Sequence, residues 1–172
     1  MEAFQPVLLK IWREACRDIE IERVAADIAS LFIGDLPLAR LLIRRVDIRR
    51  KCLETVAEEV FLRGAAPGNA WTQCSDQQWA SLNDWSRAGR VARLQDPAPA
   101  GSKQDLGFLP PGPLEGEALA CPLHREKDLT GLLLLVAKPG ERFSRRHEEL
   151  AGVLADPFSL ALENDRRLRA LA

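Results

Sequence analysis

Residues 118–136 read ALACPLHREKDLTGLLLLV, two apolar runs separated by a short polar stretch. In the first run, the larger apolar residues of 119–123 alternate along the chain, which is the period of a β-strand. Residues 125–128 are all charged and predict the tip of a hairpin. The second run, residues 131–136, is apolar on both faces of a strand and therefore predicts a place at the centre of a sheet.

The segment after this hairpin predicts a long helix. Pro139-Gly140 predicts a turn, and Ser144 is placed to cap a helix whose apolar residues include Leu150, Val153 and Leu154. Asp156-Pro157 then interrupts the pattern, either because Asp156 caps a new helix with Pro157 at its first position or because the helix is kinked there. An apolar stripe continues beyond this point, formed by Phe158, Ala161, Leu162, Leu168 and Leu171.

Two helices and two strands are expected before the middle of the chain. Apolar residues recur at helical spacing in residues 4–19 and again in residues 21–32. Residues 38–47 are apolar on both faces, which predicts a strand covered on both sides. Residues 52–60 alternate, with a short helix as the alternative. In the strand interpretation Cys52, Val56 and Val60 share one face, and Leu53, Thr55 and Ala57 share the other.

The middle of the chain is less regular. Residues 71–94 predict a mixture of loop and helix, and residues 96–115 are too rich in proline and glycine to form regular structure for long. The order of elements is helix, helix, strand, strand, irregular region, strand, strand and long helix. This order predicts an α+β fold, an antiparallel sheet flanked by helices, with the N- and C-terminal helices packed together on one side.

Composition excludes several functional classes. The chain has 172 residues, 47% of them hydrophobic, and a formal net charge of -1, so we expect one domain with no direct nucleic-acid binding. The four cysteines, Cys16, Cys52, Cys74 and Cys121, form no metal-ligand spacing, so no metal site is predicted. The N-terminus does not resemble a signal peptide and no apolar run is long enough to span a membrane. We therefore expect a cytoplasmic protein.

The C-terminal third resembles the GAF family. In that family a strand closing in Pro-Leu is followed by a short hairpin, a strand that begins with Gly and is apolar, a Phe-Ser pair that opens a helix, and Ala-Leu-Glu-Asn near the end of that helix. The corresponding residues here are Ala120-Cys121-Pro122-Leu123, Gly131-Leu132-Leu133-Leu134-Leu135, Phe143-Ser144 and Ala161-Leu162-Glu163-Asn164. The resemblance implies a GAF-like (PAS-related) domain over residues 3–164.

A narrower resemblance concerns the ends of the chain. Residues 156–169 resemble the exit helix of GAF domains in sigma-54-dependent, Fis-family transcriptional activators. Residues 12–21 are similar to the same group, including its formate-hydrogenlyase activator type. This resemblance implies a sensory domain that binds a small effector, with residues 165–172 beginning a linker helix. The ATPase and DNA-binding modules of such proteins would then be encoded downstream, since the GxxxxGK[ST] loop of the ATPase does not occur here.

The apolar stripe of the exit helix predicts a homodimer. Such a stripe, flanked by charged residues, can pair with its copy as a parallel two-helix stalk. We expect residues 150–158 to pack in the chain's own core, and Leu162, Leu168 and Leu171 to lie increasingly between two chains.

The family resemblance also implies where a ligand would bind. GAF domains bind small molecules between the sheet and the irregular middle region, so the candidate pocket residues are Trp71, Cys74, Trp79, Trp85 and Cys121. Trp79 and Trp85 are six residues apart and should point to different faces of one helix, so at most one should face a pocket. The identity of the effector, and any cofactor, is not given by the sequence.

Two other functions are consistent with the same residues. The first is a degenerate GAF module that serves mainly for dimerisation, with its pocket filled by side chains. The second is a thiol-dependent enzyme similar to the GAF-like methionine sulfoxide reductases, with Cys74 and Cys121 as the candidate thiols.

The only basic cluster comprises Arg44, Arg45, Arg49, Arg50 and Lys51, and we expect it to be a solvated strand end paired with nearby glutamates.

Overall fold

The computed structural model describes residues 20–32, 34, 36–62, 70–95, 106–114 and 116–171. The helix expected over residues 4–19, with Cys16, lies outside these residues, as does the first half of the proline-rich stretch. None of the helices that the structure describes combines the length and apolarity that crossing a bilayer requires.

The described strands form a six-stranded antiparallel sheet in the order β3-β2-β1-β6-β5-β4. The sequence predicted four of these strands, and the edge strands β3 and β4 are three-residue elements that it missed. The strands are β1 (Leu38–Asp47), β2 (Cys52–Val60), β3 (Trp71–Gln73), β4 (Ala92–Leu94), β5 (Ala118–Arg125) and β6 (Asp128–Ala137). The predicted hairpin is β5–β6, and β6 lies at the centre of the sheet beside β1.

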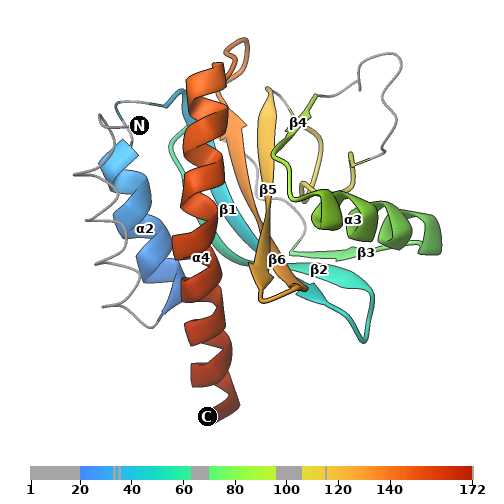
Figure 1. The fold of residues 1–172 in the computed structure, drawn as a ribbon. Helices are drawn as coiled ribbons and strands as arrows, with labels where there is room; N and C mark the ends of the chain where they lie inside the picture. The colour runs from blue at the N-terminus through green and yellow to red at the C-terminus, as the bar shows by residue number, and fades with distance from the viewer. Residues whose placement is uncertain are drawn as a thin grey trace.

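Helices cover both faces of the sheet (Figure 1). Helix α2 (Ile21–Phe32) and helix α4 (Arg145–Leu171) pack against each other on one face, as expected, and helix α3 (Asp76–Ala88) lies on the other. Successive residues of β6 alternate between the two layers: Leu133 and Leu135 join the cluster under α2 and α4, whereas Leu132 and Leu134 join the cluster under α3. This double burial explains why the central strand has almost no polar residues.

A β-bulge corrects the simple alternation predicted for β2. Ile43 of β1 pairs with Ala57, but the next residue, Arg44, pairs with Thr55, so Val56 is an extra residue in β2. A bulge changes which face the following residues point to. Leu53 therefore packs in the cluster under α3, whereas Val56 and Ala57 both pack in the cluster under α2 and α4.

Helix α4 begins as predicted and then continues through Pro157. Ser144 Oγ accepts from the backbone N–H of His147 at 3.2 Å, and His147 Nδ1 accepts from the backbone N–H of Ser144 at 3.0 Å. The prediction that Asp156 caps a new helix is wrong, because a single helix runs from Arg145 to Leu171. Pro157 removes one helical hydrogen bond, and the burial of Leu154 and Phe158 on either side of it offsets that loss.

The far half of α4 corrects the expectation for Leu162. Its side chain is only 2% exposed and belongs to the cluster under α2 and α4, so it does not face a second chain. The reason is the close approach of the helix to Gly131, where a Cβ added to the glycine would lie 2.6 Å from Leu162 Cδ2 and 2.6 Å from the carbonyl oxygen of Arg44. Leu168 and Leu171 are 38% and 87% exposed.

We predict that Gly131→Ala lowers the free energy of unfolding by about 1–3 kcal/mol, because the added methyl group meets both a backbone oxygen and the side chain of Leu162. Urea unfolding followed by circular dichroism measures the change. The matched control is Gly152→Ala in α4, where the nearest atom is 3.7 Å away. That change should stabilise the helix by about 0.5–1 kcal/mol. Equal stability of the two variants would contradict the close approach.

Candidate functional site

The face of the sheet under α3 is the face where the family resemblance places a ligand. Helix α3 and residues 106–114, called here the covering segment, close this face. Their inward side chains pack with the sheet in one apolar cluster. Its larger buried members are Leu42, Val46, Leu53, Leu82, Trp85, Leu94, Leu106, Leu109, Leu132, Leu134 and Val136. Among the described residues, this face is therefore largely a packed apolar layer.

Arg44 is a charged side chain inside this layer. It lies on β1 between Leu42 and Val46, which belong to the cluster, and it is fully buried. Its guanidinium donates four hydrogen bonds, and every acceptor is an uncharged oxygen. The acceptors are the Leu109 carbonyl (2.8 Å), the Leu53 carbonyl (3.3 Å), Thr72 Oγ1 (2.9 Å) and Thr55 Oγ1 (3.1 Å).

The electrostatic consequence is a buried cation without a carboxylate partner among the described residues. Burial lowers the pKa of Arg44 from its ordinary 12.5 to about 10, and the thiols of Cys74 and Cys52 oppose this shift. The guanidinium is therefore charged at neutral pH. Buried charges in proteins are usually paired with an opposite charge. Arg44 is thus the group on this face that would gain most from a ligand with a carboxylate or another strong acceptor.

Arg44 also holds the covering segment onto the sheet. The bond from its Nη1 to the Leu109 carbonyl joins residues 65 positions apart in the chain. The segment has no regular structure, as predicted, yet Leu106, Leu109, Pro110 and Pro111 are buried. It is therefore an irregular but packed layer, anchored by one charged side chain.

The three predicted tryptophans occupy different places. Trp85 is buried in the cluster, and its indole N–H donates to the Arg90 carbonyl at 2.9 Å. Trp79 packs against the same cluster from its rim, so the expectation that the two tryptophans point to different faces of one helix is wrong. An inward helix face is wide enough to include both. Trp71 is half exposed on β3, and Arg50 lies 5.9 Å from the centre of its ring.

The two predicted cysteines lie on opposite faces of the sheet. Cys74 belongs to the cluster under α3. Cys121 belongs to the cluster under α2 and α4, because the alternation of β5 turns Ala118 and Ala120 toward α3 instead. This placement corrects the prediction that Cys121 lines the same pocket. The sheet separates the two thiols, so they cannot act on one substrate.

Burial also makes both thiols poor nucleophiles. It raises the pKa of Cys121 to about 12, with a smaller contribution from Glu148, and it raises the pKa of Cys74. Since the thiolate is the reactive form of cysteine, neither residue has the lowered pKa that thiol catalysis requires. Within the ranges that the structure describes, no group of three or more histidine, cysteine or carboxylate side chains is arranged to hold a metal ion.

The predicted basic cluster is not one surface. Arg44 is buried on one face, whereas its neighbour Arg45 points to the other and pairs with Asp165 of α4 at 2.7 Å. Lys51 lies near Asp76 at 3.3 Å, on the α3 side. The expectation of a solvated strand end paired with glutamates is therefore wrong for Arg44 and Arg45. Their position inside the apolar strand 38–47 was the signal of burial.

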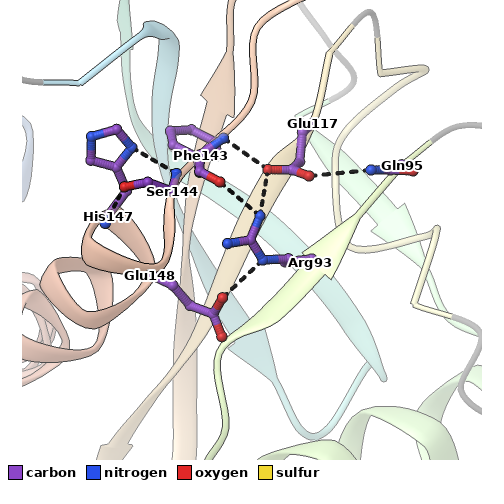
Figure 2. A network of polar contacts seen from close by, with 7 residues as sticks. All are labelled: Arg93, Gln95, Glu117, Phe143, Ser144, His147 and Glu148. Atoms are coloured by element: carbon purple, nitrogen blue, oxygen red, sulfur yellow. Dashed lines mark hydrogen bonds and ion pairs between the residues drawn. The ribbon is translucent and has the colours of Figure 1, made fainter.

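A polar network that the sequence analysis missed joins β4 to the start of α4 (Figure 2). Its centre is the buried carboxylate of Glu117, which accepts from Arg93 Nη1 (2.9 Å), Gln95 Nε2 (3.2 Å) and the backbone N–H of Phe143 (2.9 Å). Arg93 also donates to the Phe143 carbonyl and, through Nε, to Glu148 of α4 at 2.8 Å. We call these five residues the Glu117 clamp.

We predict that Arg44→Lys lowers the free energy of unfolding by about 2 kcal/mol. The ammonium keeps the charge but cannot reach four acceptors with the planar geometry of a guanidinium, so buried oxygens lose their donors. Chemical denaturation measures the loss. Arg49→Lys, at an exposed turn position, is the control and should change stability by less than about 0.5 kcal/mol. A neutral effect of Arg44→Lys would show that the four bonds contribute little.

We also predict that Glu117→Gln lowers the free energy of unfolding by about 2 kcal/mol, because it replaces a charged acceptor of three hydrogen bonds with an amide. Amide hydrogen exchange should also increase at Phe143 and in the first turn of α4. The control is Glu149→Gln, an exposed change on the same helix. Unchanged exchange at Phe143 would contradict the role assigned to the clamp.

Solved structures of known proteins share this fold, although no family model and no curated protein matches the sequence. Three similar structures are a free methionine-R-sulfoxide reductase from Neisseria meningitidis in complex with its substrate, the GAF domain of an Acinetobacter phosphoenolpyruvate-protein phosphotransferase, and the blue-light-absorbing PixJ GAF domain of Thermosynechococcus elongatus.

The similarity extends over nearly the whole of each chain. The reductase matches with a TM-score of 0.66 and 14% identity, over 96% of this chain and 91% of that one. The Acinetobacter domain matches with a TM-score of 0.67 and 14% identity, over 98% and 97%. The PixJ domain matches with a TM-score of 0.59 and 23% identity, over 91% and 92%. At these identities the likeness establishes the fold: this chain has the α+β fold of GAF domains.

Proposed function

We propose that this chain is a non-catalytic sensory domain that binds a small effector on the α3 face and regulates an attached transcriptional activator through a dimeric exit helix. The observation that carries the proposal is Arg44, a fully buried cation whose bonds within the described part of the chain all end on uncharged oxygens. A protein gains no stability from such a charge unless something compensates it. A small anionic effector would supply the missing negative charge.

The effector would compete with the covering segment for the same donor. The Leu109 carbonyl accepts from Arg44 Nη1, and a carboxylate would form a stronger, charge-assisted bond there. Displacing Leu109 would release the covering segment from the sheet. The effector would then be detected as a change in the packing of residues 106–114.

Two routes lead from this face to α4. The covering segment precedes Glu117 in the chain, so its movement would reach the Glu117 clamp and, through Phe143 and Glu148, the first turn of the helix. The second route is shorter, because Arg44 is joined by one peptide bond to Arg45, which pairs with Asp165 of α4. A shift of β1 at this point would act on α4 at Asp165.

The output would begin beyond Leu162. Leu168 and Leu171 are exposed apolar residues on the last turns of α4, and together with the same residues of a second copy they would form the start of a parallel two-helix stalk.

Control of a transcriptional activator is supported by the resemblance of residues 156–169 to the exit helices of such proteins. Sequencing the gene downstream of residue 172 tests it, since an ATPase module there supports the proposal and an unrelated module contradicts it.

Two alternatives have particular support. The packed apolar layer under α3 favours a module that serves mainly for dimerisation, because it leaves little room for a ligand among the described residues. The similarity to the substrate complex of a methionine-R-sulfoxide reductase is consistent with an enzyme. The enzyme is the less favoured alternative, because Cys74 and Cys121 lie on opposite faces and both have raised pKa values.

Identification of small molecules that co-purify with the protein tests effector binding. We expect denaturation of the protein to release a compound that carries a carboxylate or another anionic group, which mass spectrometry identifies. Adding that compound, or a member of a panel of small carboxylates, at about one hundred times its Kd should raise the melting temperature by about 5–10 °C. Arg44→Lys should reduce the shift, and the exposed Arg49→Lys should not.

The contrary result distinguishes the alternatives. If no compound co-purifies and no carboxylate shifts the melting temperature, effector binding at this face is contradicted. Light scattering then tests the dimerisation module, which predicts a dimer that Leu171→Asp dissociates. A monomer at high concentration in the unaltered protein would exclude that alternative as well.

A further inference from the structure

A second candidate site lies beside the far half of α4, away from the Arg44 guanidinium. A cavity of about 280 Å³ is bordered by the end of β1, the β5–β6 hairpin and α4. This volume is near the lower limit of small-molecule sites, which are typically about 300–1,000 Å³. The residues that matter for its chemistry are Arg45, Ile48, Arg125, Leu129, Glu163 and Arg166.

Guanidinium groups outnumber carboxylates around this cavity. The buried carboxylate of Glu163 is shared by Arg125 at 2.9 Å, Arg166 at 3.0 Å and Arg167 at 3.2 Å. The neighbouring carboxylate of Asp165 is shared by Arg45 at 2.7 Å and Arg169 at 2.8 Å. Two buried carboxylates of α4 therefore hold five arginines, and Asp128 in the cavity lining adds one further carboxylate.

Within the contacts of the described residues, Arg125 and Arg166 keep guanidinium donors that Glu163 does not use. Each lines the cavity, each is about half exposed, and each uses only part of its guanidinium on Glu163. Because hydrogen bonding from Arg166 and the nearby positive charges hold the pKa of Glu163 below its ordinary value, this carboxylate stays ionised at neutral pH and keeps the arginines in place. An incoming anion would reduce the repulsion among the arginines.

Part of the cavity lining is apolar. Ile48 is 65% exposed although it is a large hydrophobic residue, and Leu129 and Val46 lie beside it in the lining. Arginines that are only hydrated by solvent do not require exposed apolar side chains beside them. The combination matches a ligand with a charged end and an apolar body.

We propose that this cavity binds a small molecule that carries a carboxylate or phosphate group, with the charged group on Arg125 and Arg166 and the apolar part against Ile48 and Leu129. This ligand would connect the tip of the β5–β6 hairpin to α4 one turn beyond Leu162, where the helix leaves the core. Arg44 does not line this cavity, although Val46 borders both the cavity and the apolar cluster under α3. The proposal does not depend on effector binding at Arg44.

The test uses benzoate, inorganic phosphate and benzamide, the neutral analogue of benzoate, at constant ionic strength. Binding to the whole chain is followed by changes in amide ¹H–¹⁵N chemical shifts. We expect saturable millimolar binding of benzoate, with shifts at Arg125, Thr130 and Arg166, and no binding of benzamide. Arg166→Gln should weaken benzoate binding at least about tenfold, because it removes charge-assisted bonds to the ligand.

The matched control is Arg167→Gln. Arg167 contacts the same carboxylate of Glu163 but does not line the cavity, so its substitution removes the same charge and should leave the Kd nearly unchanged. Ile48→Ser, at an exposed position that the fold does not need, should weaken binding of benzoate but not of phosphate. This variant distinguishes an amphiphilic carboxylate ligand from a simple phosphate ligand.

Three results would overturn the proposal. Equal loss with Arg167→Gln and Arg166→Gln would show general attraction to positive charge, and binding of benzamide would show that the arginines are not used. Loss of binding in Arg44→Lys, with retention in Arg166→Gln, would place the anion on the α3 face instead. Retention in Arg44→Lys with loss in Arg166→Gln supports the second site whatever the fate of the first.

Discussion

The antiparallel pairing of β1 with β6 is the interaction on which the rest of the structure depends. These two strands are apolar on both faces, so both faces of the sheet must be covered. The pairing joins residues about ninety positions apart and thereby brings α2 beside α4 (Figure 1). Strand β5 then pairs with the free edge of β6. Helix α3 and the covering segment pack on the face of the sheet that α2 and α4 leave open.

Arg44, Arg45 and Gly131 lie together at one end of this strand pair. Arg44 pairs with Leu132 and points toward α3, whereas Arg45 pairs with Gly131 and points toward α4. Gly131, in turn, is the residue that lets Leu162 of α4 approach the sheet closely. A buried cation, a partly buried ion pair and a close helix contact thus share four neighbouring backbone positions. The proposed effector face and the exit helix are separated here by the thickness of one strand.

The sequence predicted the framework well because the framework depends on local patterns. The β5–β6 hairpin, the central position of β6 and the capped start of α4 all follow from alternation, charge and Ser144, which are read over a few residues. The α+β fold is confirmed by the solved structures of similar shape. The short edge strands β3 and β4 were missed because three residues carry too little pattern to distinguish a strand from a loop.

The candidate site was predicted less well because it depends on long-range packing. The face to which Cys121 points depends on the register of β5, and the burial of Leu162 depends on Gly131, which lies 31 positions earlier. Arg44 was read as part of a solvated basic cluster, although its neighbours in the chain are apolar. The Glu117 clamp joins β4 to α4 through side chains that no local motif connects. The type of a residue indicated which chemistry its side chain could perform, but its burial and its partners could be known only from the tertiary structure.

The central claim is that Arg44 is a buried cation which, among the described residues, is bonded only to uncharged oxygens. Side-chain NMR of arginine tests its burial and hydrogen bonding most directly. In uniformly ¹⁵N-labelled protein at neutral pH, four hydrogen bonds should slow the rotation and solvent exchange of the Arg44 guanidinium. We predict separate, protected Nη signals for Arg44, and rapidly exchanging signals for the exposed Arg49. Arg44 signals that exchange as fast as those of Arg49 would contradict the claim.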